Sequence, residues 1–139
     1  MFYLYTLLAL AIIAAAVHLS PLKAKAWTAL AIVAAAGIPL AVKAAGVLSG
    51  GGICRLWAFD SLMLGPDSGS LDTLSALFVL VIAVGAAAAT LYSQGYLRHA
   101  LAHKSPAHIS LHYTALAVMS LSMLGVVASD GGYSFLFFW

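Results

Sequence analysis

The sequence has few charged residues and almost no cysteine. Only 7% of its 139 residues are charged, whereas about a quarter of the residues of a soluble domain are. So few charges exclude a water-soluble globular protein, and they exclude intrinsic disorder, which needs high charge and low hydrophobicity. The net charge of +2 is too small for a nucleic-acid-binding surface. The single cysteine, Cys54, excludes an internal disulfide framework and a cysteine zinc site.

Apolar residues, in contrast, make up 64% of the chain, and the mean hydropathy is +1.07. A helix needs ~20 mostly apolar residues to cross a hydrocarbon core of ~30 Å. Four stretches meet this requirement, at residues 2–19, 27–48, 71–96 and 109–128. The sequence therefore predicts an all-α integral membrane protein with four transmembrane helices, surrounded by the lipid bilayer.

The positive charges are divided unequally among the connections between these stretches. Lys23 and Lys25 lie in the first connection, Arg98 and Lys104 in the third, and Arg55 alone in the second. Because cytoplasmic loops carry the excess of Lys and Arg, we expect the first and third connections in the cytoplasm. This predicts a multi-pass protein of the inner (plasma) membrane with its N-terminus outside.

The second connection is long and covers residues 49–70. A short apolar run at residues 54–63 is followed by residues 65–69 (GPDSG), whose composition is typical of a turn. We therefore expect a short strand or hairpin outside the membrane between the second and third helices.

A further apolar stretch runs from Tyr133 to Trp139, after Asp130, which we expect to be a solvated loop acid. A helix of this length covers ~10 Å, about a third of the hydrocarbon core. It would leave carbonyl groups unpaired in lipid. The stretch is therefore typical of the start of a fifth span in a fragment or a split subunit. The alternative is an aromatic anchor at the membrane interface.

Few residues are candidates for chemistry. Lys43 is the only charge well inside a predicted span, and such charges often mark proton or ion paths. Alternatively, its long side chain reaches the nearby interface. Asp72 begins the third stretch, and we expect it to cap that helix. The sequence contains no candidate nucleophile, carboxylate pair or redox-cofactor motif, so we expect no active site and no bound cofactor.

Five histidines raise the possibility of a haem or metal site. His99 and His103 are four residues apart, as are His108 and His112, so each pair would share a helix face. A b-type haem needs two facing histidines at matched depth, and zinc needs three or four ligands. No acidic residue lies near enough in sequence to complete such a set with these or with His18. We therefore expect no metal site.

Three motifs resemble a known membrane-protein family. Residues 72–78 (DTLSALF) are similar to the D-x-L-S-A-x-F opening of the third helix in antiporter-like subunits. Residues 92–97 (YSQGYL) resemble the Y-S-x-x-Y-L/M that closes that helix. Residues 108–113 and 129–139 look most like the hydrogenase-4 or formate hydrogenlyase membrane subunit. The family also includes subunits of respiratory NADH-quinone oxidoreductase and Mrp sodium/proton antiporters, and the likeness covers roughly residues 55–139.

The resemblance implies the N-terminal bundle of a proton-translocating membrane subunit. In the family, the segment similar to residues 135–139 continues with a glutamate on the fifth helix, which pairs with a lysine on a later helix. Both would follow Trp139, so the spans present here are expected to act mainly as scaffold. The implied partners are other membrane subunits of a hydrogenase or quinone oxidoreductase complex. The alternative is a small stand-alone four-helix protein that binds haem or metal through histidine, or an assembly or anchor subunit.

Overall fold

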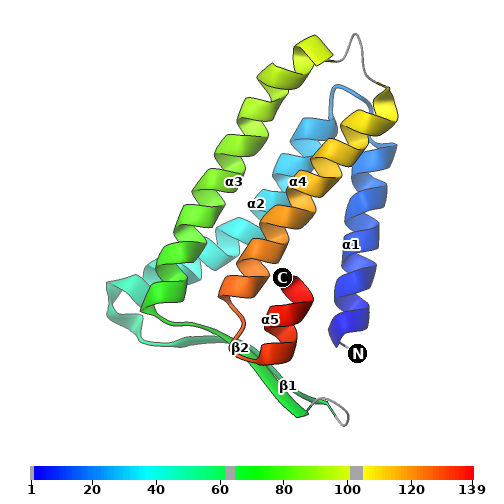
Figure 1. Cartoon of the computed structure of the whole chain (residues 1–139). Coiled ribbons are helices and arrows are strands. Elements are labelled where there is room, and N and C mark those ends of the chain that lie inside the picture. The colour runs from blue at the N-terminus through cyan, green and yellow to red at the C-terminus, as the bar shows by residue number, and fades with distance from the viewer. Residues whose placement is uncertain (1, 62–64, 101–104) are drawn as a thin grey trace.

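The structure is a computed structural model that describes residues 2–61, 65–100 and 105–139. Within these residues the chain is mostly helical with one two-stranded sheet. Figure 1 shows an elongated bundle with a hairpin at one end. The bundle helices are α1 (Phe2–Leu19), α2 (Lys25–Gly46), α3 (Thr73–Ala100) and α4 (Pro106–Val127). The hairpin consists of β1 (Cys54–Ser61) and β2 (Gly65–Leu71), and a short helix, α5 (Gly132–Phe138), follows α4.

Three helical segments of the described chain are long and apolar enough to cross a membrane: Lys25–Gly51, Thr73–Leu97 and Pro106–Val127. They are compatible with a multi-pass membrane protein. α1 is apolar but shorter, with its apolar part at Leu4–Leu19, so its crossing of the membrane stays a prediction. The four apolar stretches expected from the sequence coincide with α1 to α4 within four residues at each end.

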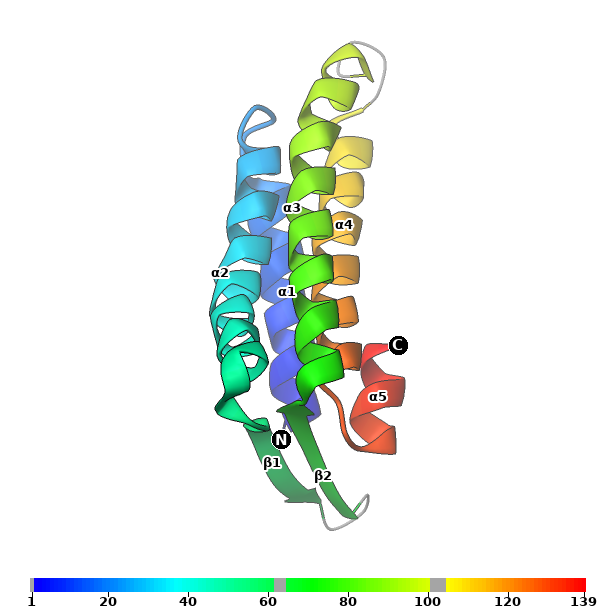
Figure 2. The same ribbon diagram turned by 90° about the vertical axis from the view of Figure 1, so that its left-hand side faces the viewer.

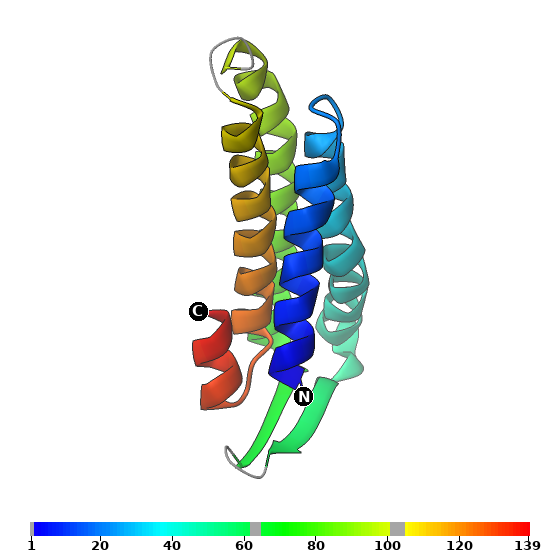
Figure 3. The same cartoon turned by 90° about the vertical axis from the view of Figure 1, so that its right-hand side faces the viewer.

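The two ends of the bundle differ in charge. At one end, here called the loop end, residues 20–24 connect α1 to α2 and the chain passes from α3 to α4 (Figure 1). The other end, here called the hairpin end, holds the sheet, α5 and the start of α1 (Figure 3). All four acidic residues of the chain lie at the hairpin end: Asp60, Asp67, Asp72 and Asp130. The two Lys- and Arg-rich connections thus share one end. The side of the membrane that this end faces stays a prediction.

Small residues allow α2 and α3 to approach closely. Gly37 is buried, and a Cβ atom at this position would lie 3.9 Å from the Cβ of Ala83 on α3. Ala44 and Ala76 are fully buried further along the same contact. In lipid, helices associate through such van der Waals packing, since apolar burial gives little drive there. Beyond this contact α2 continues as a π-helical segment, η1 (Val47–Gly51), in which Gly50 has a φ of 100°.

Lys25, a residue of α2, caps the C-terminus of α1. Its ammonium group donates hydrogen bonds to the carbonyl oxygens of Val17, at 2.9 Å, and His18, at 2.8 Å. The last carbonyls of a helix have no partner within the helix, and the helix dipole places partial negative charge there. Lys25 is only 3% exposed, so this cation is a buried C-terminal cap as well as a charge of the first connection.

Asp72 caps the N-terminus of α3, as the sequence predicts. Its carboxylate accepts a hydrogen bond from the backbone N–H of Ser75 at 2.7 Å. This bond is the main reason that the pKa of Asp72 lies below its ordinary value. The helix therefore begins with a charge-assisted bond at the point where the chain leaves the hairpin.

The expectation of a turn at residues 65–69 is wrong, because these residues form strand β2. β2 pairs antiparallel with β1, from Cys54 opposite Leu71 to Ser61 opposite Gly65, and the register shifts once, between Arg55 and Trp57. Proline is tolerated near the end of a two-stranded ribbon, which has free edges. Gly69 lies against the ring of Trp57, where any side chain would collide. Pairing with the apolar β1 thus overrides a turn-like composition. Figure 2 shows the hairpin extending the long axis of the bundle, and its location outside the membrane stays a prediction.

Lys25→Met should destabilise the bundle by about 1–3 kcal/mol, because the substitution leaves buried carbonyl oxygens without donors. Thermal unfolding in detergent measures the effect. The matched control is Lys43→Gln, which removes an exposed lysine and should change folding and insertion little. Equal unfolding temperatures for the two variants would show that the Lys25 cap contributes nothing.

Asp72→Asn should lower stability at pH 7, because asparagine keeps an acceptor for Ser75 but loses the charge. A carboxyl whose folded pKa is lowered stabilises the fold above its unfolded pKa of ~3.9 and loses that contribution as pH falls through the folded pKa. The difference between wild type and variant should therefore begin to shrink as the pH falls below about 4 and vanish below the folded pKa of Asp72. Unfolding measured from pH 7 to pH 2 tests this, and a pH-independent difference contradicts it.

Candidate functional site

Lys43, the candidate for an ion path, lies on the surface of α2 in the turn before η1, toward the hairpin end. It has no hydrogen-bond or ion-pair partner among the residues that the structure describes. An exposed lysine near the end of a span can extend its ammonium group to the interface. This placement fits the alternative in which the long side chain of Lys43 reaches the interface. A role of Lys43 in ion transfer stays a prediction.

The polar side chains inside the bundle are bonded to their own helices. Thr90 and Ser93 of α3 donate to the carbonyl oxygens of Ala86 and Thr90, both at 2.7 Å. Ser110 and Ser120 of α4 bond in the same way to carbonyls one turn earlier. Among the described residues, the buried charged side chains are Lys25 and Asp67, at opposite ends of the bundle. The described interior therefore holds no relay of charged groups.

The described histidines do not assemble a ligand set. His18 is exposed near the end of α1. His108 Nδ1 lies 2.8 Å from the hydroxyl of Ser105 at the start of α4, and His112 is edge-on to Tyr113. His103 and the side chain of His99 lie outside the described residues. Across the described part of the chain, no three His, Cys, Asp or Glu side chains come close enough to hold a metal ion.

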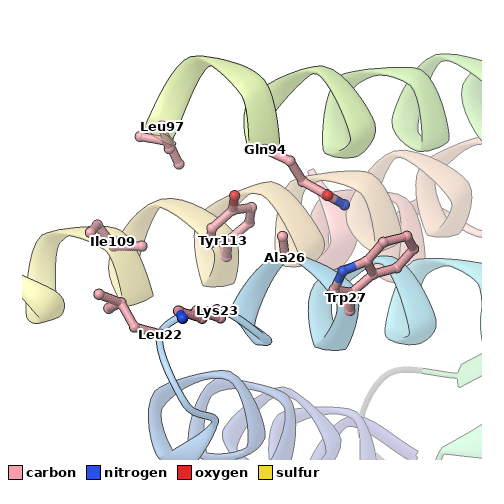
Figure 4. Close-up of a pocket in the computed structure, with 8 residues that line it drawn as sticks. All are labelled: Leu22, Lys23, Ala26, Trp27, Gln94, Leu97, Ile109 and Tyr113. Atoms are coloured by element: carbon pink, nitrogen blue, oxygen red, sulfur yellow. The ribbon is translucent and has the colours of Figure 1, made fainter. Parts of the chain in front are cut away.

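A pocket of about 360 Å³ opens at the loop end between the first turn of α2, the end of α3 and the start of α4 (Figure 4). Small-molecule sites commonly measure about 300–1,000 Å³. One wall is apolar, and four side chains bring polar groups to the pocket. The lining residues are Leu22, Lys23, Ala26, Trp27, Gln94, Leu97, Ile109 and Tyr113.

Two of the polar groups in this pocket have no hydrogen-bond partner among the described residues, and one of them, the Gln94 amide nitrogen, is a buried atom. Gln94 Nε2 is inaccessible to solvent and has no hydrogen-bond partner within the described structure. Tyr113 is 3% exposed, and its hydroxyl, which points toward α3 in Figure 4, likewise has no partner among the described residues. Such groups are uncommon in native proteins and often mark a missing water or ligand. Sequence reasoning missed both residues, because their proximity arises only when α3 and α4 pack together.

A second polar cluster lies at the hairpin end, where Asp67 of β2 binds the N-terminus of α5. Its carboxylate accepts hydrogen bonds from the backbone N–H of Ser134, at 2.9 Å, and from the Ser134 hydroxyl, at 2.7 Å. Asp67 is 4% exposed and Ser134 is fully buried. A side chain at Gly131 would collide with this carboxylate. Asp67 therefore acts as a capping acid supplied from a distant part of the chain.

Asp130 reinforces the same junction. It is exposed, as expected for a loop acid, but it also accepts hydrogen bonds from the hydroxyls of Ser70, at 2.9 Å, and Ser68, at 3.3 Å. The backbone adds two further bonds, from Ser70 N to Ala128 O and from Asp130 N to Ser68 O. The segment between α4 and α5 thus lies along β2. These hydrogen bonds fix the hairpin to the segment between α4 and α5.

Comparison with known proteins gives this chain no relative, since neither a protein-family model nor a curated protein matches it. The resemblance to antiporter-like subunits therefore rests on the motifs in the sequence, and it stays a prediction.

Ser134→Ala should loosen α5 from the hairpin, because it removes the hydroxyl bond to Asp67. A hydrogen bond to a charged group contributes about 1.5–3 kcal/mol, so the amides of α5 should exchange about tenfold faster or more. Hydrogen exchange followed by mass spectrometry measures this. Tyr133→Phe is the matched control, because it removes the hydroxyl of the neighbouring, half-exposed residue. Equal exchange rates in the two variants would contradict the capping role of Asp67.

Proposed function

We propose that this chain is the N-terminal structural bundle of a proton-translocating, antiporter-like membrane subunit. The parent complex would be of the hydrogenase-4/formate hydrogenlyase type or the NADH-quinone oxidoreductase type. The observation that carries the proposal is the succession of three family-like motifs, at family-like spacing, on two consecutive apolar helices, α3 and α4, and the segment after them.

The residues of these motifs have structural roles that explain their types. Asp72 caps α3, and the fully buried Ala76 lies against the hairpin-end core one turn later. At the other end of α3, Ser93 is buried and bonded to its own helix, whereas Tyr92 and Tyr96 are 76% and 64% exposed. In these two motifs small or polar residues pack inside the bundle and most large residues face outward, whereas Leu97 and, in residues 108–113, Ile109 and Tyr113 are buried. This division is what a scaffold helix between neighbouring elements requires.

The exposed apolar surface also supports a scaffold within a larger membrane assembly. α3 presents Phe78, Val81 and Val84 on its outer side, with exposed fractions of 48%, 61% and 70%. α1 and α4 expose similar residues, among them Leu8, Ile12, Leu111 and Met119. Patches of this extent are incompatible with water and mark contact with lipid or other helices. In the proposed complex, lipid covers part of this surface and further transmembrane helices cover the rest.

In this function, the bundle holds other parts of the subunit in place and performs no chemistry of its own. Proton transfer through a membrane needs groups that change charge at successive depths. The described interior has none between Lys25 and Asp67. In the proposed subunit, the proton-carrying lysine and glutamate residues lie on helices that pack against this bundle. The loop end then faces the cytoplasm, in accord with its lysines and arginines.

Co-purification tests the proposal. The tagged chain, extracted from its native membrane in mild detergent, should bring with it subunits of a hydrogenase-like or quinone-reductase-like complex, identified by mass spectrometry. A tagged four-span membrane protein of unrelated sequence, extracted in parallel, is the control. Recovery of the chain without redox subunits would contradict the proposal. A Soret absorption band in the purified protein would instead favour the stand-alone haem protein.

A further inference from the structure

We propose that the pocket at the loop end binds the phosphate headgroup of an anionic phospholipid, because it combines a buried, unsatisfied amide donor with further donors, a cation and an apolar wall at the end of the membrane-spanning helices. The inference concerns residues Lys23, Trp27, Gln94 and Tyr113. It stands independently of the proposed scaffold function, since any membrane protein with this pocket could bind the lipid.

The polar groups of the pocket match an acceptor-rich, negatively charged ligand. The Lys23 ammonium and the Trp27 indole N–H are donors only, while the Gln94 amide and the Tyr113 hydroxyl each offer a donor. No acidic residue lines the pocket. A phosphodiester supplies oxygen acceptors and a negative charge, and therefore complements all four groups. A ligand rich in hydrogen-bond donors would leave these four groups unpaired. A cation would be repelled by the ammonium group.

The unpaired donors, of which the Gln94 amide nitrogen is buried, indicate a specific site rather than a general attraction to the membrane surface. Gln94 Nε2 is buried without a partner, and the hydroxyl of the almost fully buried Tyr113 also lacks one among the described residues. Burying such groups unpaired carries a cost that a bound ligand removes. Figure 4 shows the two side chains approaching the same space from α3 and α4, with Trp27 facing them from α2.

The rest of the pocket favours a lipid over a free phosphate ion. Leu22, Ala26, Leu97 and Ile109 form an apolar wall beside the donors. Trp27 is 59% exposed in the first turn of α2, a position typical of aromatic residues at the level of lipid headgroups. From Trp27, the apolar surface of the bundle continues toward the hairpin end. The acyl chains of a bound lipid can lie along this surface. A free phosphate ion would accept hydrogen bonds from the donors but would leave the apolar wall exposed to water.

The charge distribution of the whole chain selects an anionic lipid. The four acidic residues lie at the hairpin end, whereas Lys23 and Lys25 lie at the loop end. Basic pockets between transmembrane helices bind anionic headgroups, and basic residues near a membrane surface attract anionic lipid. Phosphatidylcholine carries the same phosphate, but its quaternary ammonium would meet this positively charged end without a carboxylate to pair it.

Native mass spectrometry of the whole chain, released from detergent with defined lipid, tests the assignment. Phosphatidylglycerol should bind at least about tenfold more tightly than phosphatidylcholine, because only phosphatidylcholine brings a second cation close to the Lys23 ammonium. Gln94→Leu and Tyr113→Phe, which roughly preserve side-chain volume, should each weaken phosphatidylglycerol binding by about three- to tenfold. Tyr92→Phe removes an exposed hydroxyl from the same helix as Gln94 outside the pocket and should bind like wild type.

Two further arms keep the proposal falsifiable. Lys23→Gln changes an exposed residue that the fold does not need, so a fall in phosphatidylglycerol affinity with unchanged unfolding temperature supports the site even if a core variant fails to fold. Inorganic phosphate at the lipid concentration should not displace the lipid, and full displacement would assign the pocket to free phosphate. Equal affinity for the two lipids, or unchanged affinity in Lys23→Gln and Tyr113→Phe, would overturn the proposal.

Discussion

The bonding of backbone polar groups in hydrocarbon is the constraint on which the rest of this structure depends. The hydrocarbon core of the bilayer offers neither donors nor acceptors, so the N–H and C=O groups of a spanning segment must bond within the protein. A helix meets this requirement except at its ends. The structure accordingly places its most specific polar contacts at helix ends: Lys25 at the end of α1, Asp72 at the start of α3 and Asp67 at the start of α5. Three of the ten charged residues of the sequence are used in this way.

This use of charge explains which features the sequence predicts well. Helix positions follow from apolar length, which is local information, so α1 to α4 were expected at nearly their observed bounds. The capping role of Asp72 is also local, because its partner Ser75 is three residues away. The prediction of a turn at residues 65–69 was wrong because the interaction that decides the conformation is not local. Composition favours a turn there, but pairing with β1 decides the conformation.

The remaining contacts could not be predicted because they join distant parts of the chain. Ser134 is 67 residues from Asp67, and no periodicity links them. The charge of Lys25 contributed to the predicted orientation of the chain in the membrane. Its burial against the end of α1, however, depends on the path of the connection between α1 and α2. Gln94 and Tyr113 were inconspicuous parts of motifs read for resemblance. Only the packing of α3 beside α4 makes them walls of one pocket.

The two ends of the bundle serve different physical purposes. At the hairpin end, carboxylates are bonded to serine residues and backbone groups, which fixes the hairpin and α5 to the helices. At the loop end, Lys25 is bonded to carbonyl groups, whereas Lys23, the buried Gln94 amide nitrogen and the Tyr113 hydroxyl are without protein partners among the described residues. The carboxylates of Asp67, Asp72 and Asp130 are thus bonded at the hairpin end, whereas the loop end keeps donors without protein partners among the described residues. If positive charge orients the loop end toward the cytoplasm, the attraction that sets topology also brings anionic lipid to the donors that lack partners. A scaffold subunit with no charge relay of its own would then be held in the bilayer both by apolar burial and by one lipid bound at a defined depth.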